Sequence, residues 1–269
     1  MPEGHTIHRL AQDYATRFLG TNVHVTSPQG KFSDAADLLT GSPLTATEAH
    51  GKHLFLRFRD SAHVHIHLGL FGKVTFGDAP APPPTDTVRL RLANATSYVD
   101  LRGPTTCALI TDAEKQAVQA RLGPDPLRTD ADPGQAYRRI SRSRTTIAAL
   151  LMDQKVVAGV GNVYRAEVLF RHGIDPYRPG RDITPAQWQA IWTDLVALMH
   201  DGVRANRIDT VRPEHTPEAM GRPPRVDDHG GEVYVYRRAN QPCHLCGTGI
   251  RTAELAARNL FWCPTCQRG

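Results

Sequence analysis

The first residues that could do chemistry stand at the start of the chain, where Met1 is followed by Pro2 and Glu3. The small proline ring favours removal of Met1 during maturation, and Pro2 would then carry a free secondary amine. An amine beside a carboxylic acid can attack a carbonyl-like carbon and move protons around it. The same pair also suits a purely structural role, because proline is common at the first position of a helix and an acid there complements the helix dipole.

Two Cys-x2-Cys pairs near the C-terminus form the second chemical pattern, Cys243 with Cys246 and, after sixteen intervening residues, Cys263 with Cys266. This spacing is typical of a structural zinc site with four thiolate ligands and no open coordination position. We therefore predict one bound Zn²⁺ ion and no metal catalysis, with redox or chance pairing as the alternative. The segment between the pairs, IRTAELAARNLFW, suits a β-hairpin.

Two further segments could bind phosphate. Arg258 lies in the predicted zinc hairpin, where a guanidinium can bind two phosphate oxygens in one plane. In MDQKVVAGVGNVYRAEVL, the spacing predicts a loop over 155–161 with Lys155, Gly159 and Gly161, and Asn162 as the cap of the next helix. Such a loop before a helix can bind phosphate, but it can equally serve only as a turn, and Arg258 can equally be a solvated surface charge.

The elements that must position these residues follow from periodicity. Apolar residues recur at helical spacing from Ile7 to Phe18, and Gly20 is a fitting stop. Residues 22–112 show short alternating runs, which predict an antiparallel β-sandwich or barrel, with a helix near 113–122 after it. Beyond a linker at 123–134, rich in Pro, Gly and Asp, the pattern is helical. We predict an α+β protein with a catalytic helix and β-sandwich at 1–122, a helical domain at 135–232, in which 212–231 is a mobile loop, and a zinc finger at 233–269.

Bulk properties narrow the function classes. A formal net charge of +5 and a pI of about 9.1 favour anionic partners. The chain has no apolar run long enough to cross a membrane. Its N-terminus lacks the pattern of a secretory signal. Four of the five cysteines cluster, which indicates a reducing compartment with a metal site rather than a disulfide framework. The remaining one, Cys107, is interpreted as a buried small side chain. We expect a cytoplasmic, nucleoid-associated protein.

Several motifs together resemble the formamidopyrimidine-DNA glycosylase/endonuclease VIII family of base-excision repair enzymes, most of all its actinobacterial endonuclease VIII branch. They occur in the family's order along nearly the whole chain: Pro2-Glu3-Gly4, Gly51-Lys52-His53, Gly123-Pro124-Asp125-Pro126-Leu127, AGVGNVYRAEVLF, and the four-cysteine finger with Arg258. The resemblance implies an N-terminal helix and β-sandwich, a helix–two-turns–helix domain and a zinc finger. It also implies a monomer that binds double-stranded DNA containing damaged bases or abasic sites.

The resemblance also implies roles for individual residues. Pro2 is expected to be the nucleophile, Glu3 the general acid and base, and Lys52 a catalytic lysine beside a phosphate. Leu70 and Phe71 would fill the gap left by the flipped nucleotide, whereas Lys155, Asn162 and Arg258 would grip phosphates. Gly69 departs from relatives that carry a larger side chain there. Without the resemblance, Lys52 could be a solvated turn residue, and Leu70 and Phe71 could be core residues of a strand.

The expected function is therefore a bifunctional DNA glycosylase and AP lyase that forms a Schiff base at Pro2 and cleaves the strand by β,δ-elimination. Guanine-directed relatives typically begin Pro-Glu-Leu-Pro-Glu, so the Pro-Glu-Gly-His start favours oxidised pyrimidines as substrates. The main alternative is a protein that binds damaged or kinked DNA without cutting it, which would need neither Pro2-Glu3 nor Lys52. A ribosomal or topoisomerase component is a third reading, but such proteins lack this N-terminus.

Overall fold

The computed structural model describes residues 2–226 and 231–268, which form two compact units. The first unit is Met1–Arg121 and the second is Leu122–Gly269. Each unit has its own hydrophobic core, and each is described by itself below.

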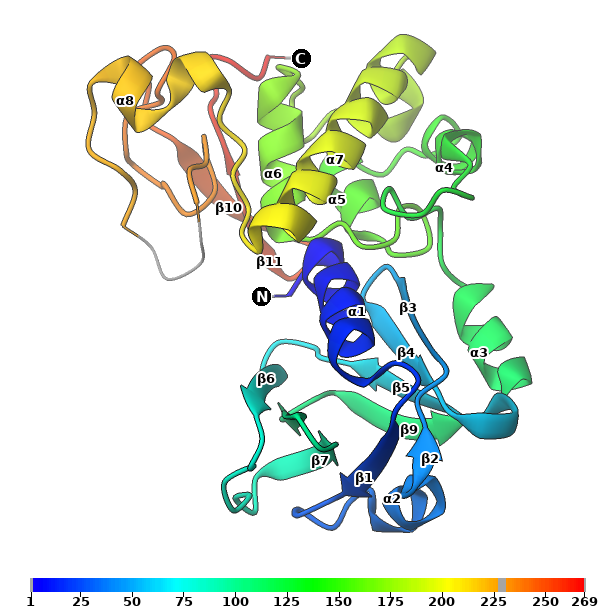
Figure 1. The fold of residues 1–269 in the computed structure, drawn as a ribbon. Helices are drawn as coiled ribbons and strands as arrows, with labels where there is room; N and C mark the ends of the chain where they lie inside the picture. The colour runs from blue at the N-terminus through cyan, green and yellow to red at the C-terminus, as the bar shows by residue number, and fades with distance from the viewer. Residues whose placement is uncertain (1, 227–230, 269) are drawn as a thin grey trace. The chain divides into compact units, whose positions relative to one another are not determined.

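The first unit consists of a long helix, α1 (Gly4–Phe18), and two antiparallel sheets (Figure 1). The five-stranded sheet has the order β2-β1-β7-β8-β6 and the four-stranded sheet the order β3-β4-β5-β9. The strands are β1 (Asn22–Thr26), β2 (Ser42–Pro43), β3 (Ala46–His50), β4 (His53–Arg57), β5 (His63–His67), β6 (Lys73–Asp78), β7 (Val88–Ala93), β8 (Ser97–Arg102) and β9 (Thr106–Ile110). The other elements are α2 (Ser33–Leu39), the 3-10 turn η1 (Arg59–Ser61) and α3 (Asp112–Gln119).

Strand alternation explains how this unit builds its core. In β4 and β5, Leu54 pairs with Ile66 and Leu56 with Val64, so that all four side chains fall on the same face of the sheet. These side chains are almost fully buried, and they belong to one cluster with Ile7, Tyr14 and Phe18 of α1. The predicted N-terminal helix and antiparallel sheets are therefore confirmed.

The second unit is helical and ends in a two-stranded hairpin. Its longest helix, α7, begins with a capping box between Thr184 and Gln187 and has Pro185 at its first position, as helix-start rules expect. Buried residues of α7 and α6 share the second core with residues of the zinc finger. The elements are α4 (Pro133–Ile140), α5 (Ile147–Met152), α6 (Asn162–Arg171), η2 (Gly180–Asp182), α7 (Pro185–Ala205), η3 (Pro213–His215), α8 (Pro217–Met220), β10 (Arg251–Leu255) and β11 (Arg258–Trp262).

The structure corrects some sequence-based expectations. The helix expected near 113–122 is α3, which begins at Asp112 because Thr111 and Glu114 form a capping box. The segment 212–231 was expected to be a mobile loop, but it contains η3 and α8, and Thr216 caps α8 through the amide of Ala219. Residues 227–230 of that segment lie outside the described residues. Across the described residues, no helix is long and apolar enough to span a membrane.

Candidate active site and nucleic-acid interface

Pro2 and Glu3 stand immediately before α1 in the first unit. Glu3 occupies the N-cap position with an extended backbone, and its carbonyl accepts a hydrogen bond from the amide of Thr6 at 3.0 Å. The side chain of Glu3 is fully buried, whereas Pro2 is half-buried. A carboxyl group withdrawn from water next to a more accessible chain end is the arrangement that an amine nucleophile with an acid partner requires. Met1 lies outside the described residues.

Lys52 lies in the two-residue turn between β3 and β4. His50 pairs with His53 across this turn, and Gly51 adopts a positive φ of 58°, which a tight hairpin needs. Burial and then the charge of Lys52 lower the pKa of His67 at the end of β5. The lysine ammonium is therefore close enough to this imidazole to act on it through its field.

A group of histidines lies on the same sheet beside the Lys52 turn. His53 and His65 are joined by a 2.8 Å contact between Nδ1 of the first and Nε2 of the second, and their rings stack. Burial, reinforced by neighbouring positive groups, lowers the pKa of His53 to about 3 and that of His65 to about 4. Both imidazoles are therefore neutral near pH 7, so the sheet beneath Lys52 carries no competing positive charge from them.

Leu70 and Phe71 project from the turn after β5. Their exposed fractions are 51% and 87%, so neither is the core residue that the alternative interpretation proposed. Gly69 has a φ of +67°, and a Cβ there would lie 1.9 Å from Oγ1 of Thr105. A side chain at 69 would therefore require Thr105 to move and would strain the turn, which presents two apolar side chains at its tip.

In the second unit, the loop between α5 and α6 is held by the side chain of Gln154. Its amide donates to the carbonyl oxygens of Met152 and Val160 and accepts from the amide of Gly159 at 3.0 Å. The last of these hydrogen bonds occupies the N–H group of Gly159, so that donor is not available to a phosphate. Lys155 is exposed on the same loop.

Asn162 is the first residue of α6 rather than its cap, because the N-cap position belongs to Gly161. Its side chain is buried, and Nδ2 donates to the carbonyl oxygen of Asn259 in β11 at 2.9 Å. Oδ1 of Asn162 accepts from the fully buried guanidinium of Arg165. Asn162 thus ties α6 to the hairpin that carries Arg258.

Arg258 begins β11 directly after the hairpin turn. Ala256 and Ala257 at the turn have positive φ values of 53° and 55°, which match the twist of a tight two-residue connection. One guanidinium nitrogen of Arg258 donates to the carbonyl of Ala257 at 2.8 Å, whereas its buried Nε has no hydrogen-bond partner among the residues that the structure describes. The hairpin predicted between the two cysteine pairs, with Arg258 at its tip region, is confirmed.

The four cysteines converge, with all Sγ atoms within 4.8 Å of one another. The Sγ atoms of Cys243 and Cys266 are 3.8 Å apart, and those of Cys246 and Cys263 are 3.4 Å apart. A tetrahedron with Zn–S bonds of about 2.3 Å has edges of roughly 3.8 Å, so this donor set fits one zinc ion. No fifth residue joins the group among the described residues, and the four thiolates support the predicted structural zinc.

Sequence reasoning missed Glu167, which is fully buried in α6. Its carboxylate accepts hydrogen bonds from the hydroxyl of Thr210 and from three successive amides. The distances are 2.6 Å to the hydroxyl of Thr210, 2.7 Å to the amide of Tyr234, 2.9 Å to that of Val235 and 2.8 Å to that of Tyr236. The carboxylate thereby fixes the segment that leads into the zinc finger. A single acid in VYRAEVLF, a run whose one other charged residue is Arg165, was the available signal.

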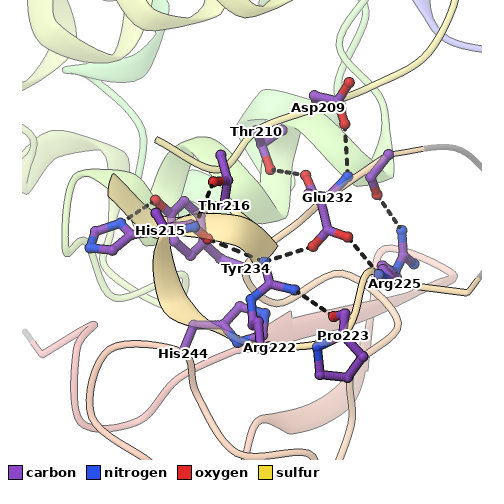
Figure 2. A network of polar contacts seen from close by, with 12 residues as sticks. Asp209, Thr210, His215, Thr216, Arg222, Pro223, Arg225, Glu232, Tyr234 and His244 are labelled. Atoms are coloured by element: carbon purple, nitrogen blue, oxygen red, sulfur yellow. Dashed lines mark hydrogen bonds and ion pairs between the residues drawn. The ribbon is translucent and has the colours of Figure 1, made fainter. Parts of the chain in front are cut away.

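A second acid, Glu232, organises the chain around α8 (Figure 2). It accepts from the amide of Arg225 at 2.5 Å and pairs with the guanidinium of Arg222 at 2.7 Å. Its own amide donates to Asp209 at 2.8 Å, and its carbonyl accepts from the amide of Thr210 at 2.8 Å. This network orders the described part of 212–231.

Comparison with known proteins places these features in one family. Residues 1–107 match the formamidopyrimidine-DNA glycosylase N-terminal domain, residues 122–212 the H2TH domain of that enzyme, and residues 240–269 the zinc finger found in FPG and IleRS. The chain therefore belongs to the formamidopyrimidine-DNA glycosylase family. Members of this family are DNA glycosylases with AP lyase activity, so the protein is an enzyme of DNA repair.

Among individual relatives, the chain is 53% identical over 271 residues to Endonuclease 8 1 of Mycobacterium tuberculosis, with 99% of this chain and all of the relative covered. It is 31% identical to the formamidopyrimidine-DNA glycosylase of Parasynechococcus marenigrum, with 99% of each chain covered. A Lactococcus lactis Fpg solved with DNA containing an abasic site shares the fold, with a TM-score of 0.79 and 22% identity over 99% of this chain and all of that one. The predicted resemblance, including its endonuclease VIII side, is confirmed.

Proposed function

We propose that this protein is a bifunctional glycosylase and AP lyase that removes oxidised pyrimidines through a Schiff base at Pro2. The observation that carries the proposal is the pair at the chain start, where Pro2 precedes a fully buried Glu3 at the N-cap of α1. The 53% identity to an endonuclease 8 over the whole chain supports the same chemistry and favours the pyrimidine side.

In the proposed reaction, the neutral amine of mature Pro2 attacks C1′ of the damaged nucleotide, the bond from C1′ to the base breaks, and the departing base takes up the proton that the amine loses. Glu3 donates a proton to the ring oxygen as the sugar opens, which leaves an iminium between Pro2 and C1′. The iminium acidifies the hydrogen on C2′, and its loss expels the 3′ phosphate. A second elimination expels the 5′ phosphate and leaves a gap of one nucleotide. A free α-amino group has a pKa of roughly 8, so part of the amine is neutral at cellular pH.

The remaining site residues would bind and bend the DNA. Lys52 would contact a phosphate near the lesion, and Leu70 and Phe71 would enter the space of the flipped nucleotide, since both are exposed at a turn tip. Lys155 and Arg258 would contact phosphates. Asn162 would join them through the second hydrogen of its amide, because only one is needed for the carbonyl of Asn259. Such an enzyme would work on chromosomal DNA as a cytoplasmic, nucleoid-associated monomer.

The decisive experiment is borohydride trapping on protein whose N-terminus has been verified by mass spectrometry. Reduction of the iminium should yield a covalent adduct with duplexes that contain thymine glycol or an abasic site, and less with oxidised guanine. Glu3→Gln should slow base excision far more than strand cleavage at preformed abasic sites. Absence of any adduct with correctly processed protein would leave only a non-cleaving binder of damaged DNA, and equal loss on both substrates would contradict the role of Glu3.

A further inference from the structure

The second unit carries a concentration of arginines that the proposed chemistry does not use. From Arg138 to Met152 the chain has four arginines and no acidic residue. The backbone pairs this region with a second basic segment, since the amide of Gly180 donates to the carbonyl of Thr145 and the amide of Arg181 to that of Ser143, both at 2.9 Å. Together these side chains form what we call the arginine ridge: Arg138, Arg139, Arg142, Arg144, Arg178 and Arg181.

Most of the positive charge of the ridge is not neutralised within the chain. Arg138 pairs with Asp132 at 3.2 Å, and Nε of Arg181 lies 3.7 Å from Asp182. The guanidinium groups of Arg142, Arg144 and Arg178 have no hydrogen bond or ion pair with any described residue. That of Arg139 donates to a backbone carbonyl oxygen, which does not neutralise its charge. Like charges gathered without counter-charges repel one another, which favours occupation by a polyanion.

The ridge is continuous with the loop between α5 and α6. The guanidinium of Arg139 donates to the carbonyl oxygen of Lys155, so α4 is tied directly to this loop. Figure 1 shows α4 on one side of α5 and α6 and the β10–β11 hairpin on the other. A DNA strand with one phosphate bound at Lys155 could therefore extend toward Arg258 in one direction and along the arginine ridge in the other.

We propose that the arginine ridge binds the phosphates of duplex DNA flanking the lesion, as an extension of the proposed interface at Lys155. This inference rests on the proposed DNA-repair function. A nucleic acid fits better than a membrane surface, because membrane-binding segments combine basic residues with several exposed apolar side chains. Among the large apolar side chains exposed in the described chain, only Tyr177 adjoins the ridge in sequence.

The test compares Arg142→Ala/Arg144→Ala with wild type for binding to a labelled duplex of about 30 base pairs that carries one tetrahydrofuran abasic-site analogue. Each phosphate contact contributes about 0.9 to the slope of log affinity against log salt, so the double variant should lose about 1.8. The ratio of the wild-type DNA affinity to that of the variant should then fall about 12-fold between about 50 and 200 mM salt. The matched control is Arg204→Ala/Arg207→Ala, whose guanidiniums pair with Asp201 and Asp209.

An unchanged slope in the ridge variant, or an equal loss in the control, would overturn the proposal. So would loss of pelleting with phosphatidylglycerol vesicles in the ridge variant without a change in DNA slope. If the alanine variant melts at a lower temperature than wild type, Arg142→Gln/Arg144→Gln replaces it. Borohydride trapping on an abasic duplex at low salt separates the two proposals, because failure there in wild type refutes the covalent chemistry and leaves the slope measurement standing.

Discussion

Replacing Glu167 with glutamine should destabilise the second unit strongly, although the change substitutes one oxygen by an NH₂ group. The carboxylate oxygen Oε2 accepts from the hydroxyl of Thr210 and the amide of Tyr234, and Oε1 accepts from the amides of Val235 and Tyr236. All of these contacts are buried. A glutamine placed with its oxygen at Oε1 directs its NH₂ group at the other two donors.

The magnitude follows from these four contacts. The hydroxyl of Thr210 can rotate to accept from the new NH₂ group, but the amide of Tyr234 cannot, and one unsatisfied buried donor costs about 1–3 kcal/mol. The two bonds to Oε1 lose their charge assistance, which makes them about half as strong and costs roughly 1–2 kcal/mol in total. Glu167→Gln should therefore lower the free energy of unfolding by about 2–5 kcal/mol.

Tryptophan fluorescence during urea unfolding measures this effect on the second unit alone. All three tryptophans of the chain, Trp188, Trp192 and Trp262, lie in that unit. The matched control is Glu218→Gln at the exposed start of α8, which should change the free energy of unfolding by no more than about 0.5 kcal/mol. A loss below about 1 kcal/mol for Glu167→Gln would refute the assignment of the carboxylate as the anchor of residues 234–236.

Three other outcomes are expected. Phe71→Ala should leave the free energy of unfolding within about 0.5 kcal/mol of wild type, because the ring is 87% exposed, but it should slow excision from duplex DNA about 5- to 100-fold through lost stacking. The control is Leu38→Ala, at a side chain that is 69% exposed. Normal excision by Phe71→Ala would contradict the wedge role. Chelation of zinc or Cys243→Ser should unfold the finger and weaken binding to an abasic duplex, as measured by fluorescence anisotropy. The control Cys107→Ser should do neither, because this cysteine lies outside the zinc group. Unchanged affinity after loss of zinc would show that the finger is dispensable for DNA binding. The pKa values of His53 and His65 are lowered to about 3 and about 4 in the folded protein. Below a pH of about 6.5, the unfolded chain therefore binds more protons than the folded one. The free energy of unfolding of the first unit should fall as the pH is lowered from about 6.5 toward about 4. Urea unfolding followed by circular dichroism should show a smaller loss in His53→Phe; an equal loss would assign the pH dependence to other groups.

Local patterns predicted much of the architecture. The zinc finger depends on four residues at fixed spacing and a short hairpin between them, so its geometry follows from a few neighbours in sequence. In β5, histidines alternate with apolar residues, and β4 carries the apolar run Leu54–Leu56, which is buried throughout. β3 and β9 show no such pattern of burial, and both lie at the edges of the four-stranded sheet, where their residues are only partly buried.

The parts that could not be predicted depend on contacts between distant residues. Asn162 suits a helix cap by residue type, yet its side chain is taken by the carbonyl of Asn259, 97 residues away. The partner of Asn162 cannot be inferred from spacing, because it depends on how separate elements pack. Gly159 is a local case, since its amide donates to the side chain of Gln154 five residues earlier, and that contact depends on the path of the loop.

The turn that displays Leu70 and Phe71 links two positions that are far apart in sequence. Oγ1 of Thr105 occupies the volume that a side chain at Gly69 would need. A relative with a bulky residue in place of this glycine should therefore have a smaller residue opposite it, or a rebuilt connection between the strands. Substitutions at these two sites should thus be inherited together, and exchanging only one of them between homologues should yield a poorly folded hybrid.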